Sequence, residues 1–297
     1  MKNKSEITEY HLSQNQPAKP QFEIFELGQY LRRHGANASK PHIHSFYQII
    51  WFKTGHGEHY VDFKAYDVQD NSIFFIAKNQ VHYFDSGTEY AGVLMHFNES
   101  FIVDNDSKIE YLLKQDLFNN PFQIPTCCVN SNVNSILDEY LKLIRLELNN
   151  EKDWYQNELL RNYLKAFLIQ VQRRRREFEK ISGQSSPVKD DKRRQLLQFT
   201  DLLEKNYKDG MTVAEYADKM NISSRTLADL TKHLLGKSPS LMIHERTILE
   251  AKRMLIHMPL NVNEIGYRLG FEDASYFVKF FKKYTDMSPM EFRKTIS

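Results

Sequence analysis

The chain has 297 residues and a formal net charge of +2, a length that predicts two domains. It contains no run of about 20 apolar residues that could span a membrane and no N-terminal apolar segment typical of a secretion signal, so we expect a cytoplasmic protein. Its two cysteines, Cys127 and Cys128, are adjacent. They lack the spacing of a disulfide framework or a metal site, which indicates reduced structural thiols.

The charge is divided unevenly along the chain. Residues 1–170 contain 16 lysines and arginines against 21 acidic residues, whereas residues 171–297 contain 24 against 17. The two parts therefore carry formal charges of −5 and +7. A basic part is compatible with nucleic-acid binding, although most surface charge only keeps a protein in solution. Sequence motifs are therefore needed to distinguish a nucleic-acid-binding surface from an ordinary solvated one.

Short aromatic and β-branched runs dominate residues 21 to about 125, as is typical of strands. The runs are "FYQIIWF", "GEHYVDF", "NSIFFIA" and "YAGVLMHF", and turn signals rich in Gly, Asn and Asp separate them. Many short strands at this spacing predict a small β-barrel or jelly roll.

Two segments with helical periodicity follow, within residues 133–148 and 159–171. The chain then runs from four arginines into Gly, Ser and Pro, a composition typical of a linker. We therefore predict an N-terminal arm, a barrel domain with following helices, a linker and a C-terminal domain, which comprise residues 1–20, 21–172, 173–191 and 192–297.

The C-terminal domain contains an internal repeat. "TVAEYADKMNISSRTLADLTKHLLGKSPSLMI" aligns with "NVNEIGYRLGFEDASYFVKFFKKYTDMSPMEFR". The offset is 49 residues at Val213 and Val262, and 50 residues from Leu227 and Phe277 onward. One structural unit is therefore written twice, with one residue inserted before the second long helix of the later copy.

Each copy has the pattern of a helix, a tight turn and a second helix. The turn residues are Asn221 and Gly270, the two residue types that most readily adopt left-handed backbone geometry. Ser223 or Ser224 in the first copy, and Asp273 in the second, stand where an N-cap is expected. This arrangement predicts two helix-turn-helix units in an all-α domain.

The second helix of the later copy has two kinds of surface. Its core-facing set is expected among the aromatic residues Phe271, Phe277, Phe280, Phe281 and Tyr284. Gly266 costs the preceding helix about 1 kcal/mol relative to Ala, which predicts a close approach of two helices there. The remaining faces present Ser275, Tyr276, Lys279, Lys282 and Lys283. A lysine face is commonly only solvated, but the second helix of a helix-turn-helix lies in the DNA major groove.

Residues 192–297 resemble the DNA-binding domain of the AraC/XylS family of bacterial transcription regulators, in which a long helix joins two helix-turn-helix units. "IGYRLGFEDASYFVKFFKKYTDMSPMEFR" matches the family signature, and "SLMIHERTILEAKRMLIH" matches the connecting helix. Thr247 stands where the family usually has Arg, and Gly266 where it usually has Ala. The resemblance implies a transcription activator without enzymatic activity that binds promoter DNA, contacts RNA polymerase and forms a homodimer.

The resemblance also assigns DNA-contacting positions. In the first unit these are Arg225, Ala228 and Asp229, to which we add Lys232. In the second they are Ser275, Tyr276 and Lys279, while Lys282 and Lys283 are better placed for phosphates. Arg225 can donate to guanine, whereas Asp229 can only accept, for example from cytosine N4. The first unit is therefore expected to discriminate between sequences and the second to anchor the protein.

Residues 20–125 resemble the cupin-like effector domain of the same family, less specifically, which implies a small organic effector. Metal-binding cupins have a His-x-His pair, a Glu and a later His where this chain has His42, His44, Gln48 and His82. Because Gln48 replaces the carboxylate, we expect no metal and no other cofactor. His44, Gln48 and His82 are assigned instead to effector binding. The alternative is a metal-dependent cupin enzyme with an accessory DNA-binding domain.

An apolar stripe on the second of the two helices suggests how the chain could dimerise. It is formed by Leu160, Tyr163, Leu164, Phe167, Leu168 and Val171. The stripe could form one side of a symmetric helix pair, as the family resemblance implies. Alternatively, it covers the core of the barrel in its own chain.

Overall fold

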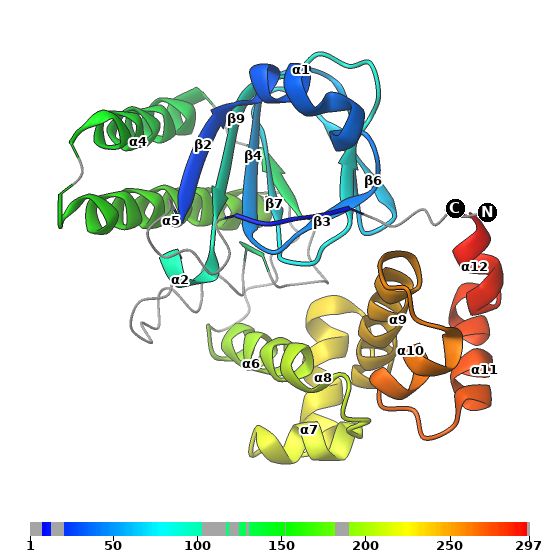
Figure 1. The fold of residues 1–297 in the computed structure, drawn as a ribbon. Helices are drawn as coiled ribbons and strands as arrows, with labels where there is room; N and C mark the ends of the chain where they lie inside the picture. Colours follow the sequence, from blue (N-terminus) through cyan, green and yellow to red (C-terminus); the bar gives the residue numbers. More distant parts are fainter. Residues whose placement is uncertain are drawn as a thin grey trace, which may run out of the picture. The chain divides into compact units, whose positions relative to one another are not determined.

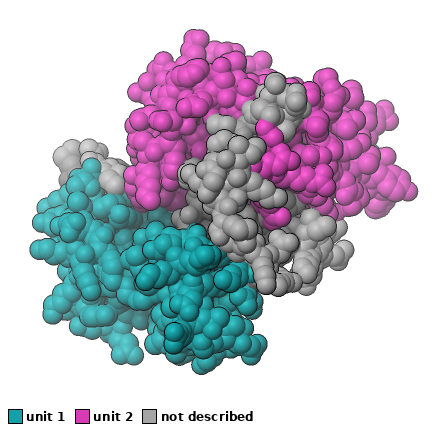
Figure 2. Space-filling view, turned by 180° about the vertical axis from the view of Figure 1, so that it is seen from behind, with its two compact units in different colours: residues 1–8, 187–297 teal, residues 9–186 magenta. Residues whose placement is uncertain are grey.

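The computed structural model of the protein describes residues 8–12, 21–102, 117–118, 125–128, 131–151, 153–181 and 190–295. The chain forms two compact units, one of residues 9–186 and one of residues 187–297 together with residues 1–8 (Figure 2). The division between residues 186 and 187 falls inside the predicted linker, while the outer boundaries of the predicted segments stay predictions. Among the described helices, none is both long and apolar enough to cross a membrane.

The N-terminal unit contains two five-stranded sheets (Figure 1). The first has the order β1 (Thr8–Tyr10), β3 (His42–His44), β8 (His82–Phe84), β5 (Gly57–Val61) and β6 (Lys64–Val68). The second has the order β10 (Thr126–Cys128), β7 (Ser72–Ile76), β4 (Tyr47–Thr54), β9 (Ala91–Phe97) and β2 (Phe22–Glu26). The four aromatic runs of the sequence thus form β4, β5, β7 and β9, which confirms the predicted barrel.

Alternation along β4 divides the hydrophobic residues of this unit between two cores. Ile50 and Phe52 pack toward the first sheet, in a core that includes Val61 of β5 and Phe84 of β8. Trp51, between them, packs on the other side of the sheet among residues of the helices. Successive side chains of a strand point to opposite faces, so one strand supplies both cores.

Helices α4 (Ser131–Asn149) and α5 (Gln156–Ile181) cover the outer face of the second sheet. The predicted dimerisation stripe lies in this core, where Leu164 and Phe167 have no exposed surface and Tyr163 packs at the edge. The prediction that this stripe pairs two copies was therefore wrong, because the stripe is buried against the second sheet and α4 of its own chain. Among the described side chains of these helices and their connection, the exposed large apolar residues are Ile136, Leu143, Leu146, Trp154, Tyr155 and Leu159.

Several elements lie where the sequence analysis expected none. Helix α1 (Leu27–Ala38) and the short α2 (Glu99–Ile102) interrupt the strand-rich region, and β1 belongs to the predicted arm. Helix α5 continues through the four arginines into the predicted linker. Cys127 on β10 packs against the helix-covered core, as expected of a structural thiol. The side chain of Cys128 lies outside the described residues.

The described elements of the C-terminal unit are all helices. They are α6 (Asp190–Asn206), α7 (Val213–Lys219), α8 (Ser224–Leu235), α9 (Pro239–His257), α10 (Val262–Arg268), α11 (Ala274–Thr285) and α12 (Pro289–Thr295). The pairs α7–α8 and α10–α11 are the two predicted helix-turn-helix units, and α9 packs against helices of both. The predicted two-domain α+β fold, a barrel with following helices and an all-α domain, is confirmed.

Matching caps begin the first helix of each helix-turn-helix unit. The Thr212 amide donates to a Glu215 carboxylate oxygen at 2.6 Å, and the Glu215 amide donates back to Thr212 Oγ1 at 3.3 Å. Asn261 and Glu264 make the same reciprocal pair at 2.7 and 2.9 Å. These capping boxes satisfy amides that have no partner inside the helix, so both units start in the same way.

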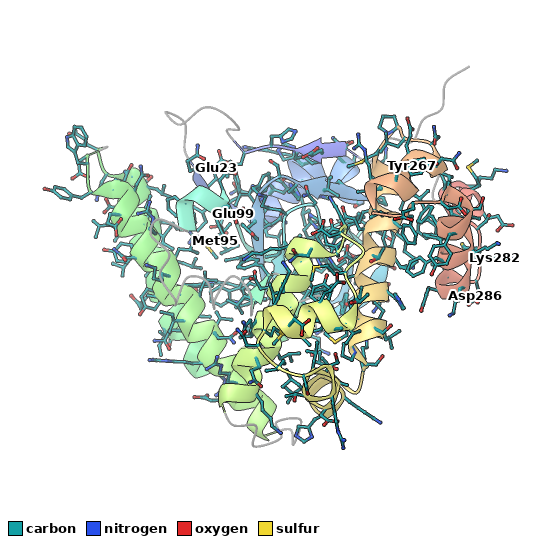
Figure 3. All side chains as sticks on the ribbon, turned by 90° about the horizontal axis from the view of Figure 1, so that it is seen from below. Glu23, Met95, Glu99, Tyr267, Lys282 and Asp286 are labelled. Carbon is teal, nitrogen blue, oxygen red and sulfur yellow. The ribbon has the colours of Figure 1, made fainter. Side chains whose placement is uncertain are left out.

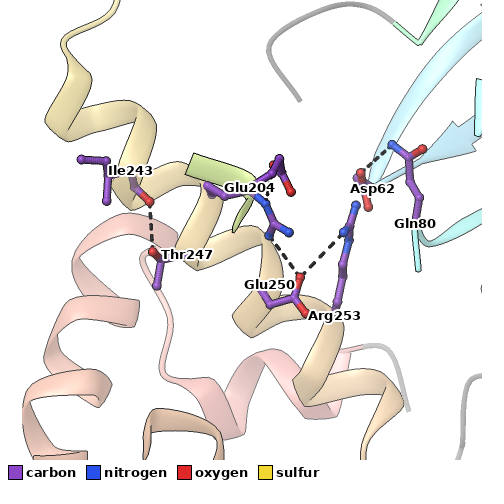
Figure 4. Close-up of polar contacts among 8 residues, drawn as sticks. Asp62, Gln80, Glu204, Ile243, Thr247, Glu250 and Arg253 are labelled. Carbon is purple, nitrogen blue, oxygen red and sulfur yellow. Dashed lines mark hydrogen bonds and ion pairs between the residues drawn. The ribbon is translucent and has the colours of Figure 1, made fainter. Parts of the chain in front are cut away.

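A buried arginine connects α9 to α6. Arg246 Nε donates to Glu204 on α6 at 2.7 Å, and Arg246 Nη1 donates to Glu250 at 3.1 Å (Figure 4). Burial by itself lowers the pKa of Arg246, but the two carboxylates more than offset this and raise it. The neighbouring Thr247 donates to the Ile243 carbonyl at 3.0 Å within α9, so its hydroxyl is satisfied without reaching another helix.

Candidate DNA interface and effector site

The turns of the two helix-turn-helix units have the predicted geometry. Asn221 has φ of 55° and Gly270 has φ of 84°, so both are left-handed. Ser223 Oγ accepts from the Thr226 amide at 3.0 Å and begins α8. Asp273 Oδ1 accepts from the Ser275 amide at 2.9 Å and begins α11. Both capping residues are among those predicted from the sequence.

The two helices of the second unit approach each other closely at Gly266. A Cβ atom on this residue would lie 3.1 Å from Cβ and Cγ of Phe277, tighter than ordinary contact. The equivalent positions of the first unit hold Ala217 and Leu227, both fully buried. A smaller residue thus faces the larger ring, which explains why glycine stands where the first copy has alanine.

The residues assigned to DNA contact lie mostly on the outside of α8 and α11. Ala228 is half-buried, while the others are exposed, and they are Arg225, Asp229, Lys232, Ser275, Tyr276, Lys279, Lys282 and Lys283. Tyr276 has 61% of its surface exposed, and Lys282 lies on α11 near its C-terminal end (Figure 3). The aromatic residues Phe277, Phe280 and Phe281 occupy the opposite, buried side.

The two exposed faces differ in charge. The sequence of α11 contains three lysines and no acidic residue, whereas α8 contains one arginine, one lysine and one aspartate. Within the described part of the chain, Arg225 and Lys279 have no hydrogen-bond or ion-pair partner, so both cations are free to bind an external anion or a base edge. Uniform positive charge suits phosphates, and mixed donors and acceptors suit base edges.

Five buried histidines gather in the barrel of the other unit. His42 and His44 on β3 and His82 on β8 offer ring nitrogens that all lie within 4.8 Å of one another. The ring of His59 lies 5.4 Å from that of His82, and the ring of His96 lies 5.9 Å from that of His44. The fold therefore brings the predicted His44 and His82 together and adds His59 and His96, which the sequence analysis missed.

Burial keeps these rings neutral. It lowers the pKa of His42, His44 and His82, and the neighbouring histidines lower the pKa of the last two further. For His59 and His96 burial lowers the pKa to about 3. Neutral imidazoles each have one nitrogen that donates and one that accepts a hydrogen bond, so the cluster can bind polar groups or metal ions.

Gln48, the third predicted effector residue, lies on the neighbouring sheet. It is paired with His96 across β4 and β9, so the two side chains share the inner face of that sheet. Its Oε1 atom is buried and has no hydrogen-bond partner among the described residues. A buried acceptor without a donor lowers the stability of the fold, which is consistent with a role in binding a polar group.

Comparisons with known proteins give the same division of the chain. A family model described as an AraC-like ligand binding domain matches residues 26–168, and one described as a helix-turn-helix domain matches residues 216–295. The chain belongs to the AraC family. The AraC-family assignment agrees with the predicted fold and with the predicted pairing of a ligand-binding and a DNA-binding domain.

Similar proteins include activators of this kind. The HTH-type transcriptional activator RhaS of Yersinia pestis bv. Antiqua (strain Angola) is 23% identical over 267 residues, covering 88% of this AraC-family chain and 91% of RhaS. Among solved structures, ToxT from Vibrio cholerae O395 is 16% identical, covers 94% of this chain and 99% of its own, and has a TM-score of 0.42. The C-terminal domain of the response regulator yesN from Fusobacterium nucleatum is 29% identical, with coverages of 32% and 93% and a TM-score of 0.31.

Proposed function

We propose that this AraC-family protein activates transcription by binding promoter operator DNA with α8 and α11, in response to a small organic effector in its barrel. The observation that carries the proposal is the repeated geometry of the two units. Both have a left-handed turn, a capped second helix and an exposed polar face opposite buried residues. Such helices enter adjacent segments of the major groove. The similarity to an activator supports the direction of the response.

The two helices have different roles in DNA binding. Arg225, Asp229 and Lys232 on α8 distinguish base sequences, helped by the short side chain of Ala228, which leaves room for a base edge. On α11, Ser275, Tyr276 and Lys279 contact bases. Lys282 and Lys283 bind phosphates and hold the protein on the duplex.

Further partners are part of the proposal. The protein acts in the cytoplasm without enzymatic activity, contacts RNA polymerase at the promoter and forms a homodimer. Because the α5 stripe is buried, we propose that dimerisation uses exposed apolar residues of α4 and the connection after it, including Leu146 and Trp154. Leu146 is 64% exposed and Trp154 is 95% exposed, which is unusual for such large apolar side chains.

Selection of DNA tests the DNA-binding part. Fragments retained by the purified protein are sequenced, and affinity for the recovered site is measured for the parent, for Arg225→Ala/Lys279→Ala, and for Lys64→Ala. Lys64 is an exposed lysine of the barrel and serves as the charge control. The double variant should lose specific binding while Lys64→Ala retains it. Equal binding of random and selected DNA by the parent would refute the proposal.

The effector part is tested in a promoter assay with the genes that the DNA selection identifies. Gln48→Ala should change the response to the inducing compound while leaving DNA affinity without inducer nearly unchanged, because the barrel and the DNA-binding helices belong to different units. His44→Ala should behave in the same way. An unchanged response in both folded variants would remove the barrel interior from the proposal.

A further inference from the structure

The histidine cluster has the geometry of a metal site without a carboxylate. The nitrogens that His42, His44 and His82 offer lie within 4.8 Å of one another, and all three side chains are buried. Three nitrogens bound tetrahedrally to one Zn²⁺ at about 2.0–2.1 Å lie about 3.4 Å apart. The three donors are therefore near enough to reach one ion if the rings shift toward it.

The hydrogen bonds of His42 and His82 occupy one nitrogen of each ring and leave the other nitrogen available to a ligand. His42 Nδ1 lies 2.7 Å from the Lys40 carbonyl oxygen. Because a carbonyl only accepts, Nδ1 must carry the proton, and Nε2 of His42 keeps a lone pair. His82 Nδ1 lies 3.4 Å from His59 Nε2, while His82 Nε2 has no partner in the described structure. A bond from one ring nitrogen to an outer acceptor is how metal-binding histidines are oriented.

The surroundings of His44 are the strongest indication of a ligand-binding site. Neither of its ring nitrogens has a hydrogen-bond partner within the described residues, and 2% of the residue is exposed. Its ring is enclosed by the rings of Tyr10, Phe46 and His82. Two unsatisfied buried nitrogens cost stability unless a ligand uses them.

The donor set points to a class of ion. Three neutral imidazoles suit Zn²⁺, Cu²⁺ or Ni²⁺, whereas Mg²⁺ and Ca²⁺ require oxygen ligands. Gln48, where metal-binding cupins have a carboxylate, need not be a ligand, because three protein ligands and one open position already form a complete type of zinc site.

We infer that His42, His44 and His82 bind one divalent transition-metal ion, most favourably Zn²⁺, with a fourth position open to the effector. The charge of the site then defines the effector class. Three neutral ligands leave the double positive charge of the ion uncompensated in a buried site, which favours an anionic effector over water as the fourth ligand. The half-buried Glu23 shares the inner face with His96 across β2 and β9, but it is not one of the three clustered ligands. The effector is therefore a small organic acid that binds the ion through an oxygen.

This inference rests on the proposed effector role of the barrel, and its test distinguishes failure of metal binding from failure of the proposed function. Full-length protein without an affinity tag is freed of metal with a chelator and titrated with Co²⁺, whose tetrahedral complexes absorb strongly in the visible range. One Co²⁺ per chain should bind with that spectrum, and Zn²⁺ should displace it. Absence of specific binding by the folded parent would overturn the inference, while DNA binding by the same sample would leave the proposed function standing.

Variants locate the ion. His44→Gln and His82→Gln should each weaken Co²⁺ binding by about 100-fold or more, since even loss of an outer partner costs 10–100-fold. His34→Gln removes an exposed histidine of the same unit and should bind like the parent. Circular dichroism and tryptophan fluorescence verify folding of each variant, because Trp51 and Trp154 lie in the same unit as the cluster. Equal Co²⁺ affinity in the His44→Gln, His34→Gln and parent proteins would place the ion elsewhere and overturn the assignment.

Acetate and azide probe the open position. Either anion should shift the Co²⁺ spectrum of the parent, because it would replace water or hydroxide on the ion. A spectrum unchanged by high concentrations of both would show that the fourth position is closed. That result would overturn the assignment of the effector as a metal-bound organic acid.

Discussion

The carbonyl oxygen of Lys208 lies where a side chain on Gly270 would begin, 2.0 Å from the position of its Cβ atom. Lys208 follows α6, beside the first helix-turn-helix unit, and Gly270 is the turn of the second. The absence of a side chain therefore allows the loop after α6 to contact the turn between α10 and α11. Together with α9, which packs against helices of both, this contact joins the two helix-turn-helix units of the C-terminal domain.

Substitution of Gly270 tests this contact. Gly270→Ala should destabilise the C-terminal unit by more than about 3 kcal/mol, because it adds the contact with Lys208 to the cost of about 1–2 kcal/mol for a left-handed alanine. Gly236→Ala is the matched control, since Gly236 has φ of 68° and no atom near its Cβ position. Urea unfolding followed by far-UV circular dichroism measures both, and equal losses would contradict the clash.

The pairing of Gly266 with Phe277 predicts non-additive stability. Gly266→Ala gains about 1 kcal/mol of helix propensity but must displace the ring, so it should destabilise the parent. In a Phe277→Leu background, which imitates Ala217 and Leu227 of the first unit, the same substitution should stabilise. A double-mutant cycle should give a coupling of about 1 kcal/mol or more. Additive effects would show that the ring moves aside freely.

Among the charged residues of the C-terminal unit, Arg246 should cause the largest loss of stability when it is replaced. Arg246→Met leaves Glu204 and Glu250 without their buried cation and should cost about 3–5 kcal/mol of unfolding free energy. Lys205→Ala, which breaks an i,i+4 pair whose lysine side chain is 65% exposed, should cost less than about 1 kcal/mol. Both tryptophans, Trp51 and Trp154, lie in the other unit. The unfolding transition followed by their fluorescence should therefore keep the urea midpoint of the parent. A shift of this midpoint in Arg246→Met would show that the N-terminal and C-terminal units unfold together.

The lysines of α11 should separate into two classes on a panel of operator sequences. Lys282→Ala and Lys283→Ala should weaken binding about equally on every sequence and lower the salt slope by about 1 for each lost phosphate. Lys279→Ala should cost about 1–3 kcal/mol on the preferred site and relax the choice of base at one position. Unchanged affinity in all three variants would mean that this face of α11 is merely solvated.

The oligomeric state tests the exposed apolar face. The parent should sediment as a dimer on the order of tens of micromolar, and Leu146→Asp/Trp154→Ala should raise the dimer dissociation constant at least about tenfold, which corresponds to 1.4 kcal/mol. Met290→Ala provides a control, because Met290 is 52% exposed but belongs to the C-terminal unit. A monomeric parent would remove the dimer from the proposal.

Local patterns in the sequence predicted the helix-turn-helix units well. Turn residues, caps and helical periodicity act within about ten residues, and the repeat shows each signal twice, so Asn221, Gly270, Ser223 and Asp273 were assigned correctly. The strands of the barrel were also predicted, because their alternation is a local property. Helix α1 was missed, because "LGQYLRRHGANA" contains two glycines and lies among strands.

Contacts between distant segments decided the rest. The apolar stripe of α5 reads the same whether a second copy or the chain's own sheet covers it, and only the fold shows that Trp51 and Phe167 meet. His59 and His96 were likewise single histidines in separate strands until the two sheets closed around them. The sequence by itself determined the helices of the two helix-turn-helix units, the main strands of the barrel and which face of each is apolar. Tertiary structure decided which faces meet, because burial depends on partners far away in the chain.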